Sequence, residues 1–159
     1  MKLSTVEISV GDSKHLFSFR DDSSGDRGVL QQIFVNKDYE VSQWQQGQRL
    51  FEYLSALPAD TAPLIIDAGA NIGASSLYFM ASYPNAFVYT IEPNTTNWHL
   101  LELNTTQFSN KYNFLGALHK SDGQLLLSDP GESDWGFRTA NLNTPTEGVI
   151  AQVPCICPA

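Results

Sequence analysis

Residues 64–73 read Leu64-Ile65-Ile66-Asp67-Ala68-Gly69-Ala70-Asn71-Ile72-Gly73, a short apolar run that leads into Asp-x-Gly-x-Asn-x-Gly. The apolar run does not alternate with polar residues, a pattern typical of a strand that is buried on both faces of a parallel sheet. Leu77, Met80 and Tyr83 follow at helical spacing, and Pro84 ends that pattern. The segment therefore predicts a strand, a turn with two glycines and a helix.

The same order of elements continues toward the C-terminus. A second apolar strand is predicted over residues 87–91 and ends in Glu92-Pro93-Asn94, the next helix carries Trp98 and Leu101, and a third strand is predicted over residues 112–117. Strand, helix, strand, helix, strand is the βαβαβ half of a doubly wound sheet. We therefore predict an α/β fold with a Rossmann-like, doubly wound parallel sheet that is incomplete on its C-terminal side.

The segment before this unit predicts a β-hairpin and two short helices. Alternating residues 6–10 and the apolar residues 16–19 flank a turn signal at Gly11, which is typical of a hairpin. The apolar spacing after Asp26 predicts a helix with Asp26 as its N-cap, and a second amphipathic helix runs from about Gln43 to Pro58.

The chain has the length of a single domain. We assign residues 1–159 to one domain, in which residues 1–58 form the hairpin and helices and residues 59–159 form the nucleoside-cofactor-binding half of the fold. Antiparallel strands are predicted at its end, over residues 124–127, 136–142 and 149–156.

Composition narrows the possible partners. The chain has 9 basic and 17 acidic residues and a net charge of -8, which disfavours nucleic acid and anionic membranes because their phosphates need a basic surface. Hydrophobic residues make up 42% of the chain, enough for a buried core. No stretch approaches the roughly 20 apolar residues of a membrane span, and the first residues lack the apolar region of a signal peptide. We expect a cytoplasmic protein.

The turn after the first strand predicts a ligand site at the carboxyl edge of the sheet. Gly69 and Gly73 lack Cβ atoms and so let a ligand approach the backbone, while Asp67 and Glu92 end neighbouring strands with carboxylates. An acidic residue at the position of Glu92 suits the two hydroxyls of a ribose. The implied ligand is a nucleoside-containing cofactor.

The spacing within the turn excludes two nucleotide loops. Asn71 and Ala74 stand where a dinucleotide loop needs glycines, and Ala74-Ser75 stands where a P-loop needs lysine and a hydroxyl residue. The turn has no basic side chain for a phosphate and instead an acidic one. These features favour a ligand that carries a cation, and S-adenosylmethionine fits because it has an ammonium, a sulfonium and a ribose diol.

The motif at residues 64–73, together with Thr90-Ile91-Glu92-Pro93-Asn94 and Asn104, resembles the FkbM-type methyltransferases, which are class I S-adenosylmethionine-dependent enzymes. Residues 28–39 also resemble the N-terminal lead-in of that family, so the resemblance covers roughly residues 25–157. It implies that Asp67, Gly69, Ala70, Asn71 and Gly73 surround the methionine part of the cofactor, that Glu92 holds the ribose, and that Pro93 and Ala117 border the adenine.

The resemblance implies transfer of a methyl group to the oxygen of a small hydroxylated acceptor, such as a sugar or a polyketide-type alcohol. In that family the segment that resembles Val153-Pro154-Cys155-Ile156 leads into a further strand with a K-I-D-x-E-G-like motif, whereas this sequence stops at Ala159. We therefore expect a C-terminally truncated enzyme whose activity alone is in doubt. The alternatives are a non-catalytic nucleoside-binding or oligomerising module and a fragment without function.

A sheet left open on this side exposes apolar residues such as Ile65 and Ile66, so we expect a homo-oligomer.

The catalytic residue stays unassigned. His119 follows the third strand and could act as a base, but a structural role is more common for a lone histidine.

Four further readings stay open. Gly69 and Gly73 could serve helix packing alone, and Glu92 could be a solvated strand end. Trp44, Trp98 and Trp135 are interpreted as core or lid residues, and Cys155 and Cys157 as small apolar residues of a strand in preference to metal ligands.

Overall fold

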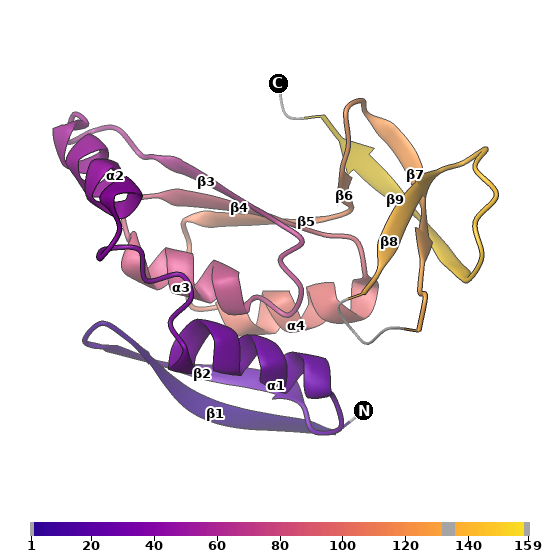
Figure 1. Ribbon diagram of the computed structural model, residues 1–159, viewed down its shortest axis with the longest axis horizontal. Helices are drawn as coiled ribbons and strands as arrows, with labels where there is room; N and C mark the ends of the chain where they lie inside the picture. The colour runs from indigo at the N-terminus through magenta and orange to yellow at the C-terminus, as the bar shows by residue number, and fades with distance from the viewer. Residues whose placement is uncertain (1, 132–135, 158–159) are drawn as a thin grey trace.

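The computed structural model describes residues 2–131 and 136–157 and has an α/β fold with three sheets in that part of the chain (Figure 1). An antiparallel hairpin comes first, a parallel sheet follows, and a curled mixed sheet of order β6-β9-β7-β8 comes last. The strands are β1 (Leu3–Val10), β2 (Ser13–Arg20), β3 (Leu64–Ala68), β4 (Phe87–Glu92), β5 (Lys111–Leu115), β6 (Ala117–Leu118), β7 (Gly123–Ser128), β8 (Arg138–Asn141) and β9 (Val149–Ile156).

The parallel sheet has the predicted βαβαβ connectivity. Its strand order is β3-β4-β5, and the connecting helices are α3 (Ala74–Ser82) and α4 (Thr95–Thr105). Both helices lie on one face of the sheet, and the hairpin packs against their other side (Figure 1). Phe17 of the hairpin, Ile72 before α3 and Leu77 of α3 are fully buried in the core between these layers. The predicted fold class is therefore confirmed.

The outer face of the parallel sheet is open to solvent, which corrects one expectation. The lack of alternation in β3 predicted burial on both faces, but Leu64 is 61% exposed and Ile66 is 47% exposed. The reason is that β3 lies at the edge of the sheet and that both connecting helices cover the opposite face. The exposure of Ile66 agrees with the separate expectation of an open sheet. Tyr112 of β5 is also exposed there and stacks on Tyr89. Association through this face stays a prediction.

The first helix begins one turn earlier than predicted. α1 (Ser24–Leu30) continues into a π-helical turn, η1 (Gln31–Val35), and its N-cap is Ser23, whose hydroxyl accepts a hydrogen bond from the Asp26 N–H at 3.0 Å. The expectation that Asp26 is the N-cap is wrong. Its carboxylate binds Arg20 instead, accepting hydrogen bonds from the backbone N–H at 2.8 Å and from Nε at 2.9 Å.

The second helix, α2 (Gln45–Ala56), begins and ends within two residues of the predicted positions. Few of its side chains are buried against the rest of the protein. Gly47 is its buried residue, and a Cβ there would lie 1.9 Å from the Val41 carbonyl oxygen. Leu50 and Tyr53 are exposed, and so is Trp44 at the N-cap, which therefore is not a core residue. Within the described residues, no helix is long and apolar enough to cross a membrane.

The predicted third strand is interrupted at Gly116, where the chain passes from β5 of the parallel sheet to β6 of the mixed sheet. A Cβ on Gly116 would lie 2.3 Å from the Phe114 ring and 2.6 Å from the Pro154 carbonyl oxygen, so only glycine fits this crossing. The C-terminal strands are present as predicted, although β8 begins at Arg138 and is shorter than expected.

We expect Asp26→Ala to lower the free energy of unfolding by about 3–5 kcal/mol, because it removes the carboxylate that accepts two hydrogen bonds from the buried Arg20 guanidinium. Urea denaturation monitored by circular dichroism measures this change. Asp22→Ala, at an exposed position in the turn between β2 and α1, is the control, with an expected change within about 0.5 kcal/mol. Equal effects of the two substitutions would contradict the role given to the buried pair.

Candidate cofactor-binding site

A cavity of about 250 Å³ lies at the carboxyl ends of β3 and β4. The loop after β3 and the start of α3 line it with Gly69, Ala70, Asn71, Ala74 and Ser75. The end of β4 and the first turn of α4 add Glu92, Pro93 and Asn97. The remaining walls come from the N-terminal segment and from the residue before β8, through Val29, Gln32, Ile33, Tyr39 and Phe137.

The loop after β3 alternates between ordinary and left-handed backbone conformations. The φ angles of Gly69, Asn71 and Gly73 are 83°, 50° and 88°. A Cβ on Gly69 would have no atom within 4 Å, so this glycine borders open space, whereas a Cβ on Gly73 would lie 2.9 Å from the Leu101 side chain. The packing interpretation therefore holds for Gly73, and Gly69 is the glycine that leaves room for a ligand.

Most amides at the start of this loop bond within the protein. The N–H groups of Gly69 and Ala70 donate to the Ile91 carbonyl at 2.8 and 3.0 Å, and that of Asn71 donates to Glu92 Oε2 at 2.9 Å. These three amides are therefore already used in hydrogen bonds inside the protein. The amides that helix geometry leaves without an intrahelical partner are those in the first turn of α3, which includes the cavity residues Ala74 and Ser75.

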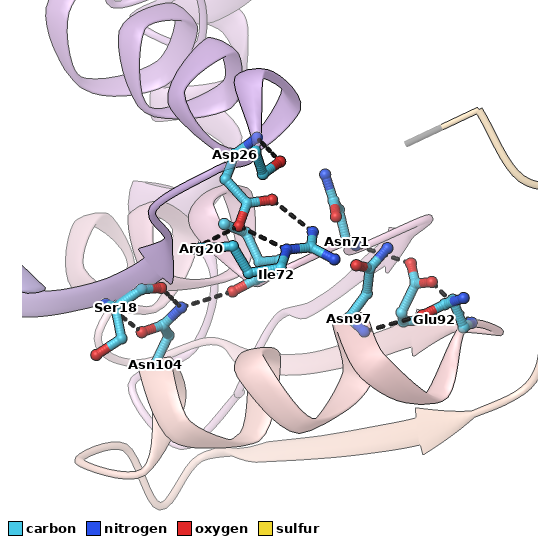
Figure 2. A network of polar contacts seen from close by, with 10 residues as sticks. Ser18, Arg20, Asp26, Asn71, Ile72, Glu92, Asn97 and Asn104 are labelled. Carbon is cyan, nitrogen blue, oxygen red and sulfur yellow. Dashed lines mark hydrogen bonds and ion pairs between the residues drawn. The ribbon is translucent and has the colours of Figure 1, made fainter. Parts of the chain in front are cut away.

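Glu92 is 4% exposed and holds the loop from the next strand (Figure 2). Besides the Asn71 N–H, it accepts the Asn94 N–H on Oε1 at 2.8 Å and a further hydrogen bond from the Asn97 side chain. Burial raises the pKa of this carboxyl above its usual range in spite of these bonds. The alternative of a solvated strand end is wrong. A carboxylate has about four acceptor positions, so about one remains for a ligand.

Asp67 lies just behind the cavity wall. Its Oδ2 accepts hydrogen bonds from the hydroxyls of Ser75 at 2.8 Å and Ser76 at 2.6 Å, and burial raises the pKa of its carboxyl. Burial also raises the pKa of the Tyr39 phenol, and the negative charge of Asp67 adds to that shift. Tyr39 and Asp67 therefore lie within each other's electrostatic field, and this side of the cavity favours positive charge.

The side-chain carbonyl oxygen of Asn71, Oδ1, is a buried hydrogen-bond acceptor that lacks a donor among the described residues. The backbone of Asn71 has a positive φ that is rare for a residue other than glycine. An unpaired buried carbonyl oxygen costs roughly 1–3 kcal/mol. An N–H or ammonium group of a ligand in the cavity would remove that cost.

The structure brings together five of the eight predicted site residues. The cavity includes Gly69, Ala70, Asn71, Glu92 and Pro93, whereas Asp67 and Gly73 lie next to it. Ala117 is not brought to the cavity: it packs in the core of the mixed sheet with Leu125 and Val153. That placement follows from the crossing at Gly116.

The cavity residues outside the two motifs were not predicted from the sequence. Val29, Ile33 and Tyr39 fall in the lead-in that carries the family resemblance, so that signal was available. Asn97 lies one turn after the Glu92-Pro93-Asn94 strand end, where the Asn94 side chain caps α4 by accepting the Asn97 N–H at 3.0 Å. Phe137 has no local signal.

Other candidates lie away from the cavity. His119 Nδ1 contacts Ser121 in the turn before β7, which favours a structural role. Trp98 is half-buried and donates from Nε1 to the Asn113 carbonyl, while Trp135 lies outside the described residues. Cys155 is buried in the mixed sheet and Cys157 is exposed, and no cluster of metal-ligating side chains occurs in residues 2–131 and 136–157.

No family model matches the chain, and no curated protein matches its sequence. The resemblance to FkbM-type methyltransferases therefore stays a prediction from motifs.

The raised pKa of Asp67 predicts a pH-dependent stability. Its native carboxyl holds a proton at pH values where the unfolded chain, with an ordinary pKa of 3.8, has lost it. Asp67 therefore makes the folded state less stable as pH rises above that value. We expect the unfolding free energy of Asp67→Asn, relative to the wild type, to increase from about pH 4 to about pH 7.

Denaturant titrations over this pH range measure the difference. Asp60→Asn, at an exposed position, is the matched control and should track the wild type. A flat difference for Asp67→Asn would mean that burial does not perturb this carboxyl.

Proposed function

We propose that the cavity binds S-adenosylmethionine and that the protein is a methyltransferase domain of the FkbM type acting on a hydroxyl group of a small acceptor. The observation that carries the proposal is the buried Glu92 carboxylate at the end of β4, bonded to the loop after β3 inside a cavity whose described walls contain no lysine or arginine. This combination suits a ribose and a cation and is unfavourable for phosphates.

The residues present fit the parts of this cofactor. The remaining acceptor position of Glu92 suits one ribose hydroxyl, which is one hydrogen bond fewer than the sequence analysis expected. The unpaired Asn71 Oδ1 and the nearby charge of Asp67 suit the amino-acid end, and the open space above Gly69 leaves room for it. Bound S-adenosylmethionine would supply an electrophilic methyl group.

The chain's own contribution to transfer is positioning. The cavity walls hold the reacting groups in line and exclude water, which is a major source of acceleration in such reactions. Tyr39 does not serve as the base, because its raised pKa keeps the phenol protonated near neutral pH and makes it a hydrogen-bond donor. The base that accepts the hydroxyl proton and the identity of the acceptor stay unassigned.

A second candidate is a non-catalytic nucleoside-binding or oligomerising module. The exposed apolar face formed by β3 and its neighbours favours it, since such a face suits self-association. In both candidates the acidic balance argues against nucleic acid and anionic membrane as partners, and a cytoplasmic location belongs to the proposal.

The test is binding of S-adenosylhomocysteine, the product of methyl transfer, by isothermal titration calorimetry. We expect Glu92→Gln to weaken binding tenfold or more, because it removes a charge-assisted hydrogen bond of roughly 1.5–3 kcal/mol. Glutamine keeps the shape of the side chain and one acceptor oxygen, so the bond from the Asn71 N–H can persist while the bond from the Asn94 N–H is lost.

Glu102→Gln is the matched control on α4, where the carboxylate faces Lys111 and not the cavity. Glu102→Gln should bind S-adenosylhomocysteine with the affinity of the wild type. Neither the wild type nor this variant should bind ATP. No binding by the wild type, or equal affinity of both variants, would overturn the proposal. Methyl transfer to a panel of hydroxylated acceptors then separates the enzyme from the binding module.

A further inference from the structure

Asn104, in the last turn of α4, contacts two segments that are far from it in sequence (Figure 2). The residue is 2% exposed. Its Nδ2 donates to the Ile72 carbonyl at 2.8 Å and to the Ser18 carbonyl at 2.9 Å, and its Oδ1 accepts the Ser18 N–H at 2.7 Å. The side-chain amide therefore pairs with the edge of β2 as a neighbouring strand would, and it uses its second N–H for the loop after β3.

Ile72 directly follows Asn71, a residue of the cavity wall with a left-handed backbone conformation. Asn71 has a φ of 50° and donates its N–H to Glu92, and Asn104 binds the carbonyl of the following residue, Ile72. Two side chains from other elements thus hold one backbone group on each of two consecutive loop residues. Ile72 is fully buried, so without Asn104 its carbonyl would lose its donor in the interior.

The same contact links the hairpin to the cavity. Beyond Ser18, β2 continues to Arg20, whose buried ion pair with Asp26 fixes α1. α1 supplies Val29 to the cavity wall. Asn104 therefore lies at the junction of the ligand loop and the N-terminal unit, although it does not touch the cavity itself.

We propose that Asn104 is a positioning residue, which holds the Ile72 carbonyl and the edge of β2 so that the loop over residues 69–73 keeps its ligand-binding shape. The inference rests on the proposed binding of S-adenosylmethionine. It predicts that substitution of Asn104 weakens ligand binding more than substitution of Asn113, a half-buried asparagine that bridges other elements.

Asn113 provides the matched control. Its side chain on β5 accepts a hydrogen bond from the Thr90 hydroxyl at 2.7 Å and donates to the Thr105 hydroxyl at 3.1 Å. It joins β4 to α4 on the same face of the sheet without contacting the loop. Asn113→Ala therefore removes an internal bridge that makes no hydrogen bond to the loop over residues 69–73.

The experiment measures S-adenosylhomocysteine binding by calorimetry for wild type, Asn104→Ala, Asn104→Asp and Asn113→Ala, at a temperature where circular dichroism reports each as folded. We expect both alanine variants to be less stable than the wild type. Only the Asn104 variants should bind tenfold or more weakly. Asn104→Asp keeps the acceptor for the Ser18 N–H and loses both donors, so its weakened binding identifies the bond to the Ile72 carbonyl and the hairpin contact as the cause.

Amide hydrogen exchange on the wild type gives a second measurement that needs no variant. The Ser18 N–H lies outside the cavity, yet ligand binding should slow its exchange because Asn104 couples it to the loop. If the wild type binds and the folded Asn104 variants bind with the same affinity, the positioning role is refuted. The same holds if the wild type binds and the exchange of the Ser18 N–H does not change. Either result leaves the proposed function intact. Absence of wild-type binding would refute the proposed function and this inference together.

Discussion

The hydrogen bond from the Asn71 N–H to the buried Glu92 carboxylate is the constraint on which the candidate site depends. The loop after β3 has three residues with positive φ, and Asn71 is the one for which this conformation is unfavourable unless neighbouring groups hold it, because glycine adopts it freely. The Ile91 carbonyl binds its first two amides, Glu92 binds the third, and Asn104 binds the Ile72 carbonyl. With the backbone held from β4 and α4, the space above Gly69 stays open and the cavity has a defined wall.

The same constraint determines the chemistry of the cavity. Because Glu92 and Asp67 are buried with raised pKa values, both carboxyls are destabilised in their charged form, and a ligand that brings positive charge or hydrogen-bond donors would relieve this cost. The unpaired Asn71 Oδ1 adds another site for a donor. Phosphate groups would meet repulsion, since the described cavity wall contains no basic side chain.

Local patterns in the sequence were sufficient for most elements, and tertiary packing accounts for the misses. Alternation predicted the hairpin, and apolar runs with helical spacing predicted the parallel unit. Asp26 was wrongly predicted as the N-cap because aspartate is common at that position. An aspartate can also pair with a buried arginine, and only tertiary packing decides between these two roles. Ala117 was expected at the cavity from the family resemblance, and nothing local revealed the break at Gly116. Phe137 enters the cavity wall from the segment before β8. β3 is exposed because coverage of a strand depends on what packs over it.

The most direct test of this account is a two-dimensional ¹⁵N–¹H NMR titration of the wild type with S-adenosylhomocysteine. The amides of residues 69–75 and 92–97 should shift in a saturable manner, because they belong to the wall that Glu92 holds together. Amides of α2, which does not line the cavity, should stay in place. An unchanged spectrum, or shifts confined to elements outside the cavity, would contradict the central claim that this loop forms a nucleoside-binding site.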